Sequence, residues 1–237
     1  CAVKGYPFVA VMAESFSIER RKLMRALGAR VVLTPAAERA TGLLRITKAL
    51  ASKHGWFMTE QFDNQANPDY HRNTTGPEIF RDFIGRRLDY YVSGWGTRGT
   101  ITGTSAILKL ARAYVRLIAT EPEGAAQSGG NPWAPHKIQG WTPDFIPSVL
   151  DRNVVDEIVT VSDDESIETA RAMAIQEGIF CGISAGGTFA AALKVAAKAE
   201  AGSTILAMLP DTGERYLSTP LFEGVKEGGD DELLEGL

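Results

Sequence analysis

The clearest chemical signal in the sequence is a glycine-rich turn. It reads Gly94-Trp95-Gly96-Thr97-Arg98-Gly99-Thr100 and lies between an expected strand over residues 88–93 and an expected helix near 99–112. Such a turn presents backbone N–H groups and the positive end of a helix to an anion, and its two threonine hydroxyls add donors. A phosphate group is therefore the expected ligand, although a tight turn capped by threonines would look the same.

The same turn also matches the G-x-G-x-x-G fingerprint of dinucleotide-binding proteins. In that interpretation Glu121, at the end of the next expected strand, binds a ribose hydroxyl, and the protein is a nicotinamide- or flavin-dependent oxidoreductase. Two features count against it. Trp95 would be bulky beside a pyrophosphate, and the fingerprint usually opens a domain.

A second short pattern, Gly182-Ile183-Ser184-Ala185-Gly186, matches the G-x-S-x-G nucleophile elbow of hydrolases. In that fold the catalytic histidine follows the serine, whereas His54, His71 and His136 all precede Ser184. A structural turn whose small residues let the helix near 187–199 approach a sheet is the better interpretation.

A third polar segment follows the expected strand over residues 204–209. It contains Asp211-Thr212-Gly213-Glu214-Arg215 and would lie at the carboxyl edge of a sheet, where open α/β folds hold ligands. Taken alone, the segment is better explained as a solvated Asp-Thr-Gly turn.

Alternating strands and helices must position these segments. Apolar, β-prone runs at 8–13, 30–34, 88–93, 115–120, 157–161 and 204–209 alternate with helical patterns at 18–27, 38–53, 99–112, 163–177 and 187–199. Continuously apolar strands between amphipathic helices indicate parallel sheets covered on both faces, so the expected class is α/β. The stretches 61–76 and 122–150 are expected to be long loops, and the acidic tail to be frayed.

Composition favours a small-molecule enzyme in a reducing compartment. The 237 residues include 25 basic and 29 acidic side chains, a net charge of −4, which gives no electrostatic case for binding nucleic acid or an anionic membrane. Cys1 and Cys181 have no metal-ligand spacing and form no disulfide framework. With no membrane-spanning run and no signal peptide in the sequence, the expected location is the cytoplasm.

The first residues look like the end of a helix, with Gly5 past its last turn and Pro7 beyond. We therefore expect residue 1 to be a break inside a larger fold.

Six blocks, in order, resemble cysteine synthases and cover the chain to about Phe222. They are Met12 to Lys22, Gln61 to Pro68, Thr74 to Ile79, Pro135 to Gly140, Gly178 to Ser184, and Leu209 to Thr219. The resemblance implies a two-domain fold-type-II pyridoxal-phosphate (PLP) enzyme, similar to the tryptophan synthase β subunit and truncated at its N-terminus. We expect residues 1–64 to belong to the smaller N-terminal domain, 65–222 to form the larger PLP-binding domain, and 223–237 to be the acidic tail.

The resemblance also assigns site residues. The loop that cradles the cofactor phosphate would be formed by Gly96, Thr97, Gly99 and Thr100. Thr212 would hydrogen-bond the pyridine nitrogen, and a neutral hydroxyl there suits β-elimination. Gln61 would contact the substrate carboxylate, and Gly140 lies in a loop that would approach the substrate when the site closes.

The implied reaction is a ping-pong β-replacement in which O-acetylserine loses its α-proton and acetate before sulfide adds to give L-cysteine. The family's Schiff-base lysine and substrate loop lie upstream of the position matching Cys1, so no catalytic residue is assigned here and Lys137 is not promoted in the lysine's place. A homodimer, and docking of a serine acetyltransferase C-terminal tail, are the implied partnerships. A catalytically silent relative that only binds partners remains the other alternative.

Arg98 departs from the glycine that the family usually has at this place in the phosphate loop. If the residue adopts a positive φ, its Cβ costs roughly 1–2 kcal/mol and tilts the N–H groups that should face the phosphate. If φ is negative, Arg98 keeps the backbone cradle and adds a cation, with its side chain often in solvent. We favour the damaging outcome, in which Arg98→Gly tightens cofactor binding.

Overall fold

The computed structural model describes residues 1–127, 130 and 132–234 of the chain. Its strands are β1 (Val9–Ala13), β2 (Arg30–Thr34), β3 (Tyr90–Gly94), β4 (Arg116–Pro122), β5 (Glu157–Val161) and β6 (Ile205–Ala207). Its α-helices are α1 (Ile18–Ala26), α2 (Arg39–His54), α3 (Ala66–Asn73), α4 (Thr75–Asp82), α5 (Gly99–Ala111), α6 (Asp163–Glu177) and α7 (Ile183–Ala196).

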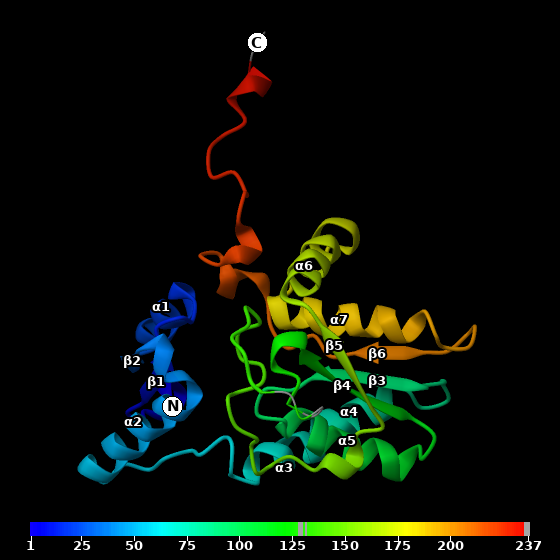
Figure 1. Cartoon of the computed structure of the whole chain (residues 1–237), viewed down its shortest axis with the longest axis horizontal. Coiled ribbons are helices and arrows are strands. Elements are labelled where there is room, and N and C mark those ends of the chain that lie inside the picture. The colour runs from blue at the N-terminus through cyan, green and yellow to red at the C-terminus, as the bar shows by residue number, and fades with distance from the viewer. Residues whose placement is uncertain (128–129, 131, 235–237) are drawn as a thin grey trace.

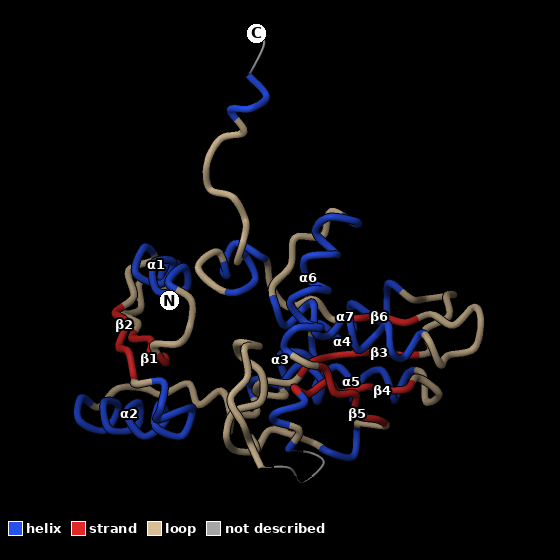
Figure 2. Tube along the Cα trace, turned by 45° about the horizontal axis from the view of Figure 1, so that its top comes forward, coloured by secondary structure: helices blue, strands red, loops and turns tan. Residues whose placement is uncertain are grey.

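Every strand pair in these residues is parallel, and the strands form two sheets. One contains β1 and β2, and the other has the strand order β5-β4-β3-β6. Figure 2 shows the small sheet with α1 and α2 beside it, joined to the rest by the segment after α2. The predicted α/β class is confirmed, whereas the domain boundary near residue 64 stays a prediction.

The four-stranded sheet is buried on both faces, which explains its continuously apolar strands. Successive strand residues point to opposite faces. Val92 belongs to a buried cluster with residues of α6 and α7, and its neighbour Tyr91 belongs to a second cluster with residues of α5. In Figure 1, α7 lies on one side of the sheet and α4 and α5 on the other. Two apolar cores therefore hold β3 in place, and β3 leads directly into the glycine-rich turn.

The prediction of a loop over residues 61–76 is wrong, because this stretch contains α3 and the start of α4. Its polar residues serve the helix ends. The Asn64 side chain accepts a hydrogen bond from the Ala66 N–H (2.9 Å), and the Thr74 hydroxyl donates to the Tyr70 carbonyl (2.7 Å). The buried residues Pro68 and Gly76 then seat both short helices against the core. Asparagine and threonine favour loops by residue type, whereas here their side chains bond the backbone at the ends of α3.

The other loop prediction agrees better with the structure. Between residues 123 and 150, most of the described residues are turns and irregular chain, and a short 3₁₀ helix covers Glu123–Ala125. The tail leaves the body after Phe222 (Figure 1) and ends its described part in a 3₁₀ turn, Asp231–Leu234. No helix among the described residues is both long and apolar enough to span a bilayer.

Candidate active site

A cavity of about 490 Å³ lies beyond the carboxyl ends of β3 and β6. The parts of the chain that contain the two-stranded and the four-stranded sheet both line it. Arg20 comes from α1 beside the small sheet. The other lining residues come from the end of β3 and the turn after it, the loop near residue 140, the first turns of α7 and the segment after β6. Those residues are Ser93, Gly94, Gly96, Thr100, Gln139, Gly140, Trp141, Ser184, Thr188, Met208, Pro210, Asp211, Thr212, Arg215 and Tyr216. The carboxyl edge of a parallel sheet is where open α/β folds bind ligands.

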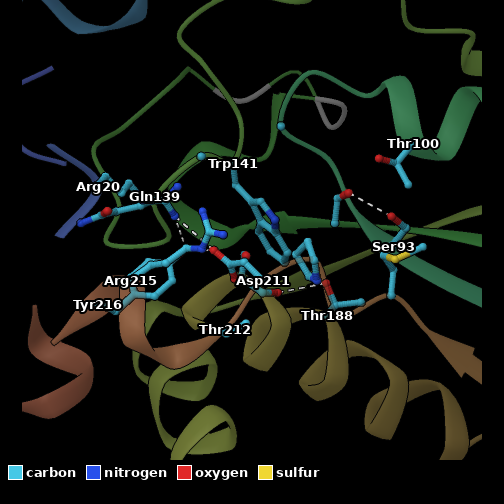
Figure 3. Close-up of a pocket in the computed structure, with 16 residues that line it drawn as sticks. Arg20, Ser93, Thr100, Gln139, Trp141, Thr188, Asp211, Thr212, Arg215 and Tyr216 are labelled. Atoms are coloured by element: carbon cyan, nitrogen blue, oxygen red, sulfur yellow. Dashed lines mark hydrogen bonds and ion pairs between the residues drawn. The ribbon is translucent and has the colours of Figure 1, made fainter. Parts of the chain in front are cut away.

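The glycine-rich turn forms one wall of this cavity. It connects β3 to α5, so the positive end of a long helix points at the site. Gly96 lines the cavity, and any side chain there would meet the Gly140 carbonyl of the neighbouring loop. The Thr100 side chain lies at the start of α5 (Figure 3). This wall has the backbone and hydroxyl donors that a phosphate requires.

The structure brings some of the predicted site residues together and leaves others outside the cavity wall. Gly96, Thr100, Gly140 and Thr212 all line the cavity. Thr97 and Gly99 belong to the same turn, where the Thr97 hydroxyl accepts a hydrogen bond from Asn67 Nδ2 at 3.0 Å. Gln61 is exposed and does not line the cavity, and its carbonyl accepts the other hydrogen bond from Asn67. The ligand contacts assigned to these residues stay predictions.

Arg98 does adopt a positive φ, 74°, as one of the two expectations required. Its side chain, however, points neither into solvent nor into the cavity, and is buried in the core. The guanidinium lies 4.3 Å from the Trp95 ring centroid, and its Nη2 is 3.7 Å from Glu121 Oε1. Glu121 Oε1 also accepts a hydrogen bond from Trp95 Nε1 at 2.8 Å. Arg98 thus ties the turn to the end of β4.

The contacts of Glu121 in this cluster argue against the interpretation as an oxidoreductase. Glu121 is completely buried and already engaged by Trp95 and Arg98, so its carboxylate does not extend to a ribose in the cavity. Trp95, which had seemed bulky beside a pyrophosphate, lies in the core below the turn.

The structure does not support the interpretation of Ser184 as a hydrolase nucleophile. Ser184 does line the cavity, at the start of α7, but none of the histidines in the described residues lines it. Within the described residues, the histidine that a nucleophile elbow requires is therefore not at the cavity. Lys137 also lies outside the cavity, on the surface near Asp164.

A polar cluster occupies the end of the cavity away from Thr100 (Figure 3). Arg20 Nη2 contacts Asp211 Oδ2 at 3.1 Å and the Tyr216 hydroxyl at 2.6 Å, and this hydroxyl lies 2.6 Å from the same carboxylate oxygen. Burial and the adjacent Asp211 carboxylate raise the pKa of the Tyr216 phenol above its ordinary value. The phenol stays protonated and can donate to Asp211.

Arg20 and Tyr216 are functional candidates that the sequence analysis did not single out. They lie 196 positions apart, and only the tertiary fold brings them together. Both do fall inside blocks that carry the family resemblance, residues 12–22 and 209–219, and that was the available signal.

The residues present fit a phosphate-bearing cofactor. Gly96 lines the cavity without a side chain, the N-terminus of α5 supplies positive potential, and Thr100 and Thr212 line the same cavity with hydroxyl-bearing side chains. The fold, with parallel sheets and this turn after a central strand, matches solved structures of the fold-type-II class of PLP enzymes.

Comparison with known proteins identifies the family. The family model described as "Pyridoxal-phosphate dependent enzyme" matches residues 1–211, and the chain belongs to this family. It is 53% identical over 236 residues to O-ureido-L-serine synthase of Streptomyces lavendulae, covering 100% of this chain and 73% of that protein. It is 44% identical over 223 residues to a cysteine synthase of Staphylococcus aureus, covering 94% and 72%.

Solved structures agree. A mutant of O-ureido-L-serine synthase with O-ureido-L-serine bound superposes with a TM-score of 0.96 at 54% identity, over 98% of this chain and 73% of that one. The predicted recognition of the family, the fold and the PLP dependence are confirmed.

Proposed function

We propose that the intact protein catalyses PLP-dependent β-replacement on O-acetylserine. The observation that carries the proposal is the meeting, at one cavity, of the glycine-rich turn at the start of α5 with Thr212 beyond β6. Cysteine synthase at 44% identity supports sulfide as the nucleophile and L-cysteine with acetate as the products. Because the resemblance places the Schiff-base lysine upstream of Cys1, the activity belongs to the longer protein.

In this proposal each wall of the cavity has its own task. Gly96, Thr97, Gly99 and Thr100 hold the cofactor phosphate through backbone N–H groups and hydroxyls. Thr212 meets the ring nitrogen with a neutral hydroxyl. When bound, the cofactor acts as an electron sink that acidifies the α-proton of the substrate. Gly140, which has a φ of 88° and whose carbonyl lies against Gly96, belongs to the loop that approaches the substrate. Because Gln61 lies outside the cavity, the segment that contains it would have to move before Gln61 reaches the substrate carboxylate.

A second nucleophile has specific support. An O-ureido-serine results when the hydroxyl oxygen of hydroxyurea, instead of sulfide, attacks the β-carbon and loses its proton, and a relative at 53% identity is named O-ureido-L-serine synthase. The polar end of the cavity suits such a molecule. Asp211 offers a carboxylate acceptor for urea N–H groups, and Arg20 offers donors for the urea carbonyl.

A competition experiment separates the two nucleophiles. The intact holoenzyme receives O-acetylserine with equal concentrations of sulfide and hydroxyurea, and the products are quantified by mass spectrometry. Formation of L-cysteine supports the cysteine synthase activity, and formation of O-ureido-L-serine supports the second candidate. Neither product, despite bound cofactor, would contradict β-replacement and favour a catalytically silent relative.

We further propose that residues 1–64 are the remainder of a small domain, residues 65–222 a large domain and residues 223–237 a tail. We also propose that the intact protein is a homodimer, as the resemblance to cysteine synthases implies. Light scattering at about micromolar concentration tests the dimer, and a monomeric mass would contradict it. Docking of a serine acetyltransferase tail into the cavity is tested by adding the corresponding C-terminal peptide to the holoenzyme and measuring inhibition.

A further inference from the structure

Helix α3 lies along the first turns of α5, directly behind the glycine-rich turn. Two glycines of α5, Gly99 and Gly103, make this approach possible. A Cβ at Gly99 would collide with the Asn67 side chain, and one at Gly103 with the Pro68 carbonyl oxygen. Two side chains of α3 face the turn, Asn67 and His71, which are four residues apart and therefore on the same helix face.

Asn67 donates to the first threonine of the turn. Its Nδ2 lies 3.0 Å from Thr97 Oγ1 and 2.8 Å from the Gln61 carbonyl oxygen. A carbonyl can only accept, so this contact fixes the nitrogen of the amide at this position. The Thr97 oxygen consequently receives a hydrogen bond, and its own proton remains available for another acceptor.

His71 stands in the same relation to the second threonine. Its Nε2 lies 3.1 Å from Thr100 Oγ1, and its Nδ1 lies 2.9 Å from Thr75 Oγ1. A neutral imidazole has one donor and one acceptor nitrogen. In the tautomer that carries its proton on Nε2, the Thr75 hydroxyl donates to Nδ1 and Nε2 donates to Thr100, and the proposal takes this tautomer. The Thr100 hydroxyl proton is again left for an acceptor in the cavity.

We propose that Asn67 and His71 are positioning residues that direct the hydroxyl protons of Thr97 and Thr100 toward the cofactor phosphate. The inference rests on the proposed phosphate site and adds a function for α3. Neither side chain lines the cavity. Each side chain acts through a threonine. By donating to the hydroxyl oxygen, it keeps the hydroxyl from donating its own hydrogen bond to that side chain. It also polarises the O–H bond toward the anion.

The test compares the affinity of the intact apoprotein for PLP with its affinity for pyridoxal, which lacks the phosphate. Asn67→Asp keeps the side-chain shape but turns the donor into an anionic acceptor, so it should weaken PLP binding about ten- to hundred-fold. His71→Leu should weaken it about ten-fold, and His71→Gln, which retains a donor, should restore it to within about three-fold. Pyridoxal affinity should stay unchanged in all three variants.

Matched controls come from the same region. Asn64→Asp introduces the same charge three residues away on a side chain that contacts the Ala66 N–H and the Thr59 carbonyl, and His54→Leu removes an exposed histidine. In both control variants, the ratio of PLP affinity to pyridoxal affinity should equal that of the wild type. Equal loss of PLP and pyridoxal affinity in Asn67→Asp and His71→Leu would show a role in packing alone and overturn the inference, as would unchanged PLP affinity. A wild-type protein that fails to prefer PLP over pyridoxal would overturn the phosphate site itself.

Discussion

Arg98 Nη2 lies 3.7 Å from Glu121 Oε1, and both side chains are completely buried. The arginine reaches this position from a backbone with a φ of 74°, at the point where the turn enters α5. A conformation that is costly for a residue with a Cβ is thus combined with a buried ionic contact to the end of the neighbouring strand. The departure from glycine has a structural use that the sequence did not reveal.

This contact predicts the effect of breaking the pair. Removing one partner leaves the other charge buried, so Arg98→Met and Glu121→Gln should each lower the free energy of unfolding by about 3–5 kcal/mol. The double variant should lose less than the sum of the two. Chemical denaturation of the four proteins measures this coupling. The exposed pair Arg116 and Glu157 is the control, where the same substitutions should cost about 0–1 kcal/mol. Additive losses at Arg98 and Glu121 would show that the contact is unimportant.

Arg98→Gly should therefore destabilise the protein, contrary to the simple expectation from the family's glycine. Glycine relieves roughly 1–2 kcal/mol of backbone strain at positive φ. It also forfeits the contact with Glu121, at about 3–5 kcal/mol. The expected net loss is about 1–4 kcal/mol, measured by thermal unfolding. An increase in stability together with tighter PLP binding would restore the original expectation that Arg98 is damaging.

Gly103→Ala should disturb the packing of α3 on α5. The added methyl would meet the Pro68 carbonyl oxygen and lie 2.9 Å from the Arg72 backbone nitrogen, and neither backbone atom can rotate away. Overpacking of this kind costs about 1–3 kcal/mol. Gly228→Ala, which meets nothing within 4 Å, is the matched control and should be neutral. Equal stability of both variants by urea denaturation would mean that α3 is not tightly seated.

Two histidines predict acid sensitivity. Burial lowers the pKa of His71 and of His136 below the ordinary value of 6.5, so the folded protein holds both neutral while the unfolded chain binds protons more readily. Their stabilising contribution is complete above pH 6.5 and is lost as the pH falls through the lower folded values. Unfolding free energies measured from about pH 8 to about pH 5 should therefore decline. Replacing both by glutamine should flatten this decline, and an unchanged decline would contradict the prediction.

Tyr216→Phe should affect the nucleophile more than the first substrate. The variant removes a hydroxyl that contacts both Arg20 and Asp211, so the polar end of the cavity loses its arrangement while the phosphate turn keeps its own. We expect the KM for the nucleophile to rise about ten-fold with a smaller change in the KM for O-acetylserine. The exposed Tyr114, changed to phenylalanine, serves as control. An effect confined to O-acetylserine would place the polar cluster at the wrong substrate.

The sequence predicted the alternation of strands and helices well, because buried parallel strands are continuously apolar and their helices are amphipathic. Runs such as 157–161 and 163–177 agree with β5 and α6 to the residue. The sequence did not predict α3, because Asn64 and Thr74 favour turns by residue type. They bond the backbone at the ends of α3 only when Pro68 and Gly76 are buried. Local patterns do not reveal such tertiary support.

For the site, sequence reasoning found the turn and Thr212 but neither the supporting side chains nor the polar cluster. Asn67 and Thr97 are 30 positions apart, and Arg20 and Asp211 are 191 apart. No spacing rule connects residues at such separations. From the sequence, a positive φ at Arg98 was one of two alternatives. The burial of its side chain could not be predicted, because it depends on contacts with both Trp95 and Glu121.

In the proposed reaction, the intact protein binds PLP in this cavity and releases acetate from O-acetylserine before any nucleophile enters. The most direct measurement mixes intact holoenzyme with excess O-acetylserine in the absence of sulfide and hydroxyurea and quantifies released acetate against bound PLP. We expect a rapid burst of about one acetate per cofactor that then stops, and that resumes when nucleophile is added. Failure to release acetate from protein that carries PLP would contradict it.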